Sequence, residues 1–258
     1  MRADETMANE AEIQIVKINE GKIRFYVVGT SPVILNRMSQ KAMRELAAPK
    51  GRKTMADKAS GAKHLPLDEY QASPYTNPDP EGKTFLQLLS SMFKKAMMTA
   101  ALDLPGTKKA QIGRLLYVMG DRVDLYGVPK LMMSVTRSAD MNKTPDIRTR
   151  AILPRWASIV DVSFIRPILN EQSVVNLMVA AGITSGMGDW RPEKGAGNYG
   201  QFRIVDSQND SEFLEIVKSG GRAAQEEGMK NPDFYDQESG ELFDWVESEN
   251  KRKGFKIS

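Results

Sequence analysis

The stretch around which this chain is organised is residues 182–205, GITSGMGDWRPEKGAGNYGQFRIV. Six of its residues are glycines, which tolerate positive φ and let a backbone approach another chain or a ligand closely. Its aromatic rings can stack and its cations can meet phosphates: Trp190, Tyr199, Arg191 and Lys194. An apolar helix is predicted before it, over 174–181, and an alternating strand after it, over 202–205. This arrangement indicates a nucleic-acid-binding surface, although an ordinary connecting loop has the same composition.

Two known phosphate-binding patterns do not fit this loop. A P-loop needs Gly-Lys followed by Ser or Thr at the start of a helix, whereas Lys194 precedes Gly195 and Ala196. The dinucleotide-binding fingerprint leaves a strand and opens a helix, which is the reverse of the order expected here. The sequence therefore predicts no nucleotide cofactor.

The composition excludes several kinds of chemistry. The chain has 258 residues, 41% hydrophobic and 27% charged, which is typical of a soluble globular protein. It has no cysteine, so disulfides, thiolate zinc sites and cysteine nucleophiles are excluded. Its single histidine, His64, cannot by itself form a catalytic triad or a multi-histidine metal site, and is expected to lie solvated in a loop. No membrane span and no signal peptide are expected, because no apolar run is long enough and residues 1–12 are polar and acidic.

The charge is unevenly distributed along the chain. The whole chain carries +3, but residues 210–258 hold 12 acidic and 7 basic side chains, so residues 1–209 carry +8. A basic body with an acidic end is common among proteins that bind nucleic acid.

The pattern of apolar residues predicts an α+β fold. Helices are expected over 39–47, 84–102 (with Thr84 as N-cap) and 171–181 (capped by Asn170), and strands over 12–18, 22–28, 115–119, 123–126, 130–135, 151–169 and 202–205. Reduced to its regular pieces, the order is strand, helix, strand, strand, helix, strand. That order is the ferredoxin-like or RRM-like split βαβ, in which two helices pack on one face of an antiparallel sheet.

Four segments are expected. Residues 1–11 form a flexible tail, and residues 12–206 form the nucleic-acid-binding domain, with insertions at about 48–83 and 137–155. Residues 207–258 form a disordered acidic tail that includes four aromatic residues in 231–250. Such a tail can imitate a single strand, dock on a replication or recombination protein, or only aid solubility.

The chain resembles the RAMP superfamily, the RRM-like proteins that include crRNA-binding backbone subunits of CRISPR effector complexes. The resemblance lies in the strand order, in the glycine-rich loop before the final strand, and in the basic excursion 137–155, which is placed like that family's projecting thumb. It covers about residues 12–206, and the loop departs from the family by its insertion of residues 189–192. The stretch 29–38, GTSPVILNRM, is also similar to the start of uncharacterised bacteriophage proteins of similar size.

The resemblance and the charge pattern predict a sequence-independent single-stranded nucleic-acid-binding protein, more specifically a single-stranded DNA-binding protein of phage replication or recombination. It is expected to assemble along the strand in the cytoplasm of a bacterial host, without a metal or cofactor. The candidate binding residues are Arg37, Lys94, Lys95, Arg137, Lys143, Arg148, Arg150, Arg155, Trp156, Trp190, Arg191, Lys194 and Tyr199. Of the three aromatic residues among them, each is also compatible with a place in the core.

Two alternatives stay open at this stage. Some RAMP relatives cut RNA, and Asp140 and Asp146 are candidate acids, but the neighbouring cations favour ion pairs for both. An enzyme is therefore not the expected function. The other alternative is a phage structural protein that polymerises without nucleic acid.

Overall fold

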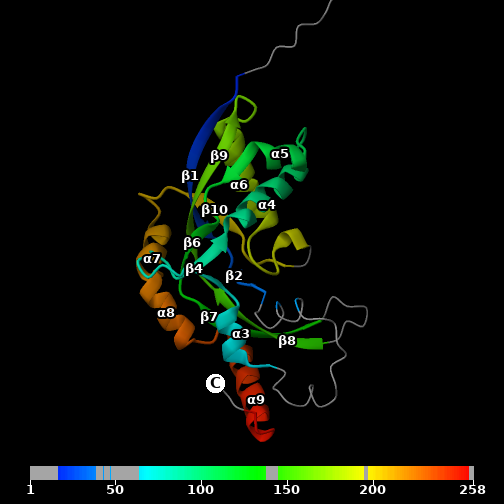
Figure 1. The fold of residues 1–258 in the computed structure, drawn as a ribbon, viewed down its shortest axis with the longest axis vertical. Helices are drawn as coiled ribbons and strands as arrows, with labels where there is room; N and C mark the ends of the chain where they lie inside the picture. The colour runs from blue at the N-terminus through cyan, green and yellow to red at the C-terminus, as the bar shows by residue number, and fades with distance from the viewer. Residues whose placement is uncertain are drawn as a thin grey trace, which may run out of the picture.

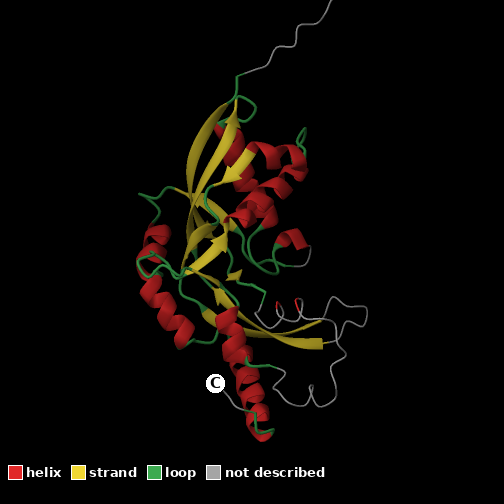
Figure 2. Ribbon diagram, in the orientation of Figure 1, coloured by secondary structure: helices red, strands yellow, loops and turns green. Residues whose placement is uncertain are grey.

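The computed structural model describes residues 17–38, 64–137, 145–194 and 197–255, together with the single positions Met43 and Ala47. Within these residues the chain forms two antiparallel sheets and helices that pack around them (Figures 1 and 2). The strands are β1 (Asn19–Gly29), β2 (Val33–Ile34), β3 (Tyr75–Thr76), β4 (Leu86–Leu89), β5 (Leu116–Val118), β6 (Arg122–Tyr126), β7 (Lys130–Arg137), β8 (Pro145–Leu153), β9 (Ala157–Arg166) and β10 (Phe202–Val205). The expected mixture of helices with antiparallel sheets is confirmed.

The helices of the described residues pack against the two sheets. They are α3 (Pro66–Ala72), α4 (Ser90–Ala100), α5 (Lys109–Leu115), α6 (Glu171–Ala180), α7 (Ser211–Ser219), α8 (Arg222–Lys230) and α9 (Gln237–Arg252). Shorter helical turns are η1 (Ala101–Asp103), η2 (Ala181–Ser185) and η3 (Pro192–Lys194). The side chain of Asn170 accepts a hydrogen bond from the backbone N–H of Ser173, which confirms it as the N-cap of α6.

The larger sheet has seven strands in the order β10-β1-β9-β6-β4-β3, and β5 pairs with β9 beyond the end of β6. Its two faces bury different residues of the same strands, because successive side chains of a strand point to opposite sides. Phe25 and Val27 of β1 join the main core with α4 and α6, whereas Val28 packs with Phe213 and Ile216 of α7. The sheet is thus covered by α4, α5 and α6 on one face and by α7 on part of the other (Figure 1).

The smaller sheet has three strands in the order β2-β8-β7. β7 and β8 form a long hairpin that projects from the larger sheet (Figure 1). One face of this hairpin packs against α3 and α9. The basic excursion expected over 137–155 therefore begins at the last residue of β7 and consists largely of strand β8. Residues 138–144 lie outside the described residues.

Two local predictions are wrong. The helix expected over 84–102 begins only at Ser90, because residues 86–89 alternate as strand β4 and pair with β6; Thr84 bonds to Asp124 instead of capping a helix. Residues 19–21, which separate the two expected strands 12–18 and 22–28, are themselves strand, since β1 runs through them opposite β9. The predicted tail 1–11, strand 12–16 and most of the helix 39–47 lie outside the described residues, as do residues 48–63 of the first insertion; residues 64–83 contain α3 and β3.

The expectation of a disordered acidic tail is wrong for residues 207–255, which contain α7, α8 and α9. Each helix has an apolar stripe among its carboxylates, and Phe213, Ile216, Met229 and Val246 of these stripes are buried. The side chain of Gln225, fully buried, bonds to the backbones of β4 and β6. Composition alone suggested disorder, but the spacing of the few apolar residues matches the helical period and lets this segment pack on the body.

Candidate nucleic-acid interface

The candidate interface forms where the glycine-rich loop lies against strand β2. Asp189 donates its backbone N–H to the carbonyl of Ile34 at 3.0 Å, and Gly200 donates to Pro32 at 2.7 Å. Gly188 has φ +72°, and a Cβ there would lie 2.3 Å from the carbonyl oxygen of Ile34, so no other residue fits this contact without displacement. The loop therefore extends the edge of the β2-β8-β7 sheet and brings Trp190 beside it.

A cavity of about 280 Å³ lies between the loop and the sheet, on the face of the hairpin away from α9. We call it the arginine cavity. Its lining combines cations, small polar groups, an aromatic ring and an apolar floor: Ile34, Asn36, Met132, Ser134, Thr136, Arg137, Arg148, Arg150, Asp189 and Trp190. The sequence predicted Arg137, Arg148, Arg150 and Trp190 as binding residues, and the structure brings these four together.

The β7–β8 register explains why these side chains share one face. Met132 lies opposite Arg150, and Ser134 lies opposite Arg148. Because side chains two residues apart on a strand point the same way, both arginines stand on one side of the hairpin, next to Ser134. Their neighbours on the other side, such as Ala151, belong to the main core.

Arg150 has an unusual environment for a cation. Its Nη1 donates to the carbonyl of Thr149 at 2.8 Å, but its Nε is buried and has no hydrogen-bond partner among the described residues. Burial lowers the pKa of Arg150, and the nearby Arg148 lowers it further, whereas Asp189 and Glu69 oppose the change. A bound anion would stabilise this guanidinium by accepting the unused hydrogen bond and offsetting the charge of Arg148.

Trp190 forms the aromatic part of the cavity wall. Its φ is +49°, a conformation that residues with a side chain rarely adopt. Its indole is 36% exposed, and its ring centroid lies 6.0 Å from that of Tyr199. A strained, half-exposed aromatic residue beside cations is the arrangement expected for base stacking.

The apolar floor was not predicted from the sequence. Ile34, Met132 and Ile152 form a small cluster of their own, against which Tyr199 and Tyr235 pack. Tyr235 comes from the segment between α8 and α9, and its backbone N–H donates to Leu131 at 2.9 Å. The polar lining residues Asn36, Ser134 and Thr136 were not predicted from the sequence either. Ser134 and Thr136 lie at the cavity because side chains alternate along β7, and Asn36 lies there because it follows β2.

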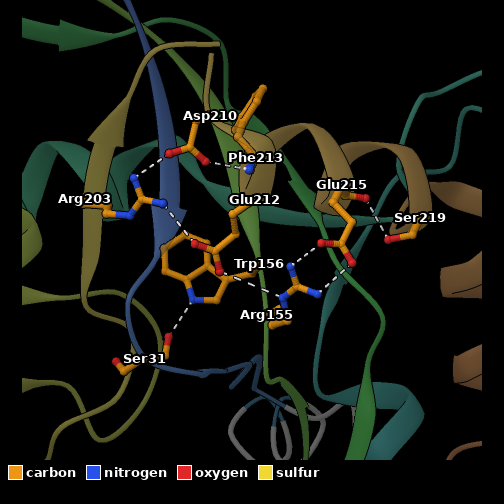
Figure 3. Close-up of polar contacts among 9 residues, drawn as sticks. All are labelled: Ser31, Arg155, Trp156, Arg203, Asp210, Glu212, Phe213, Glu215 and Ser219. Atoms are coloured by element: carbon orange, nitrogen blue, oxygen red, sulfur yellow. Dashed lines mark hydrogen bonds and ion pairs between the residues drawn. The ribbon is translucent and has the colours of Figure 1, made fainter. Parts of the chain in front are cut away.

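Trp156 and Arg155, both predicted as binding residues, lie in the core and against α7 instead. Trp156 is fully buried in the core and donates its indole N–H to the carbonyl of Ser31 at 2.8 Å, so it cannot stack on a base (Figure 3). Arg155 points to α7, where its guanidinium bonds to both carboxylate oxygens of Glu215 at 3.0 and 2.9 Å and lies 3.9 Å from Glu212 (Figure 3). Its charge is already neutralised within the chain.

The other predicted cations that the structure describes do not line the arginine cavity. Arg191 is paired with Glu193 at 2.7 Å, Arg37 lies over the ring of Tyr75, and Lys94 lies over that of Tyr117. Lys95 and Lys194 are exposed. Lys143 lies outside the described residues, as does Asp140.

His64 is not a solvated loop residue, contrary to expectation. Its side chain is 14% exposed, with Nδ1 3.1 Å from a carboxylate oxygen of Glu69 and Nε2 3.2 Å from one of Asp146. The other oxygen of Asp146 lies 3.7 Å from Nε of Arg148. Asp146 thus lies beside His64 and forms an ion pair with Arg148, the role that its cationic neighbours favoured.

No cluster of three or more His, Cys, Asp or Glu side chains suited to a metal ion occurs among the described residues. None of the helices in the described ranges is long and apolar enough to cross a membrane. Neither the models of known protein families nor the curated proteins compared with this chain give a match.

Proposed function

We propose that this protein binds single-stranded nucleic acid, with little dependence on sequence, at the arginine cavity and the adjoining loop. The observation that carries the proposal is the convergence of Arg137, Arg148, Arg150 and Trp190, from three separate segments, on one cavity. Arginines neutralise phosphates, and an aromatic face stacks on any base, which is how sequence-independent binding to single strands is achieved.

The fold supports this proposal without defining it, because one fold serves many functions. The order β10-β1-β9-β5, with α4 and α6 on one face, is the strand order of a split βαβ unit. We propose that this unit is a ferredoxin-like, RAMP-type core and that the β7–β8 hairpin corresponds to the projecting thumb. A phage replication or recombination factor that assembles along single-stranded DNA is the proposed biological role.

Fluorescence anisotropy with mixed-sequence oligonucleotides tests the binding. We expect single-stranded DNA to bind more tightly than the duplex, and RNA of the same sequence serves as a third ligand. Replacing both Arg148 and Arg150 by Ala should remove about two phosphate contacts and lower the slope of log K against log salt by about 1.4. Arg114→Ala, an exposed arginine on α5 that lies outside the cavity, is the matched control.

Duplex binding equal to or tighter than single-strand binding, or an unchanged salt slope in a double variant with a native circular dichroism spectrum, would exclude this site as a single-strand interface.

A further inference from the structure

The lining of the arginine cavity carries an excess of positive charge. Its described part contains three guanidinium groups and one carboxylate, and the ion pair of Arg148 with Asp146, 3.7 Å away, offsets one further charge. The carboxylate of the lining, Asp189, is already engaged, since Oδ2 accepts from Asn36 at 2.9 Å and Oδ1 accepts from the backbone N–H of Trp190 at 3.1 Å. The positive charge that remains suits an anionic group, and the hydrogen-bond donors decide which kind.

The hydrogen-bond donors of the cavity are also in excess. Nε of Arg150 is buried without a partner among the described residues. Nε of Arg148 lies 3.7 Å from Asp146, beyond hydrogen-bond distance, and Arg137 has no ion pair with any described residue. Ser134 adds a hydroxyl group to the same wall, whereas the hydroxyl of Thr136 donates to the carbonyl of Asp146 at 3.4 Å. Several donors that surround one small volume match the three oxygens of a terminal phosphate better than the two free oxygens of a diester.

The geometry points to a binding site for the terminal phosphate monoester of a single strand, with Arg148 and Arg150 on the phosphate oxygens and the indole of Trp190 against the terminal base. This inference rests on the proposed function and names its preferred ligand. A cavity of about 280 Å³ has room for one phosphate and its sugar, while the base meets the exposed ring at the rim.

The site is tested by competition among short oligonucleotides of one sequence that differ only at their ends. One carries a 5′-phosphate, one a 3′-phosphate, and one a hydroxyl at both ends. We expect one of the two phosphorylated strands to compete about tenfold better than the hydroxyl strand, the factor given by one added charge-assisted hydrogen bond. Comparison of the two phosphorylated strands identifies which end is bound.

Arg148→Ala is the informative variant, because Arg148 is exposed and its removal leaves the core intact. It should abolish the preference for the phosphorylated end, whereas Arg114→Ala, outside the cavity, should keep it. Loss of the same preference in both variants would mean that overall charge, not this cavity, recognises the end, and would overturn the assignment.

The failures of the two proposals are distinguishable. If all three strands compete equally while single strands still bind in an Arg148-dependent manner, the terminal-phosphate site is wrong and the proposed function stands. If no strand binds, both are wrong. Inorganic phosphate and a nucleoside monophosphate are included in thermal-shift measurements: Arg148-dependent stabilisation by either, without any strand binding, would make the cavity a site for a free small phosphate and overturn the nucleic-acid assignment.

Discussion

Arg155 and Glu215 form a two-pronged ion pair, with Nη1–Oε1 at 3.0 Å and Nη2–Oε2 at 2.9 Å, that joins the connection between β8 and β9 to helix α7 (Figure 3). The proximity lowers the pKa of the Glu215 carboxyl and raises that of Arg155. Arg203 makes similar pairs with Asp210 at 2.7 Å and Glu212 at 2.9 Å. The acidic segment at the end of the chain therefore neutralises arginines of the body while it packs against the sheet.

This packing predicts the effect of removing the last three helices. A chain that ends at Asp206 should not fold to a stable protein, because it exposes Val28 and Tyr126 on the sheet face that α7 covers. Thermal unfolding followed by circular dichroism measures the loss, and a chain that ends at Phe255 is the control. An unchanged melting temperature after truncation at Asp206 would show that α7–α9 are dispensable for the fold.

Gln225 should be among the polar residues most sensitive to substitution. Its amide oxygen accepts from the N–H groups of Phe85 and Leu86, and its two amide hydrogens are shared among the carbonyls of Leu125, Gly127 and Gly220. Gln225→Ala removes these bonds, although the carbonyl of Gly220 still accepts from the N–H of Gly127, and should lower the free energy of unfolding by about 3 kcal/mol in urea titrations.

Gln237→Ala is the matched control for this prediction, since that glutamine is exposed and bonds only to Glu241 among the described residues. It should change stability by less than about 0.5 kcal/mol. Equal effects of the two substitutions would contradict the role of Gln225 as a buried link between α8 and the sheet.

Asp210 gives the stability a defined pH dependence. The hydrogen bond from Arg203, and then the backbone N–H of Phe213, lower the pKa of its carboxyl. A carboxyl with a lowered folded-state pKa contributes stability above its unfolded value of about 3.9, and this contribution is lost as the pH falls through the folded value. Melting temperatures measured from neutral pH to below pH 4 should therefore fall more steeply in the wild type than in Asp210→Asn.

The asparagine variant can still cap α7, because its side-chain oxygen can accept from Phe213 at the position where Asp210 accepts at 2.8 Å. Asp210→Ala removes both charge and cap, so it should also lose stability at acidic pH, where Asp210→Asn resembles the wild type. Identical behaviour of the two variants at every pH would mean that the cap contributes nothing.

The two tryptophans predicted to stack should behave oppositely. Trp190→Ala should weaken single-strand binding by about 1–3 kcal/mol, the contribution of one stacked base, with little loss of stability. Trp156→Phe should lower the melting temperature, because Trp156 is fully buried and bonds to Ser31, and should leave the affinity unchanged. Weaker binding by a folded Trp156→Phe variant, with full binding by Trp190→Ala, would reverse the assignment.

Arg148 and Arg155 should also differ in their effect on the salt dependence of binding. Arg148→Ala should lower the slope of log K against log salt by about 0.7, the effect of one phosphate contact on a single strand. Arg155→Ala should leave the slope unchanged, because Arg155 already bonds to Glu215. Salt titrations of both variants decide this, and a lower slope for Arg155→Ala would show that nucleic acid displaces Glu215.

The sequence by itself determined the local elements and the chemistry that they carry. Alternation predicted strands along β1 and β9, and a capping asparagine placed the start of α6 correctly. Arg148 and Arg150 were recognised as candidate cations of a basic excursion, but the face that they share depends on strand β8, which the sequence pattern did not predict. The glycine-rich loop with its tryptophan was recognisable from its composition alone.

Only the tertiary structure decided which of these side chains are available. Arg148 and Arg155 look alike in the sequence, yet one lines a cavity and the other is neutralised by a glutamate 60 residues later. Trp156 and Trp190 also look alike in the sequence. Trp156, directly before β9, is fully buried, whereas Trp190, in the loop beside β2, is 36% exposed. The acidic helices resembled a disordered tail because their composition is polar. The reason is common to all three: burial and ion pairing depend on contacts between residues far apart in the chain, and local periodicity carries no information about which distant segment will pack there.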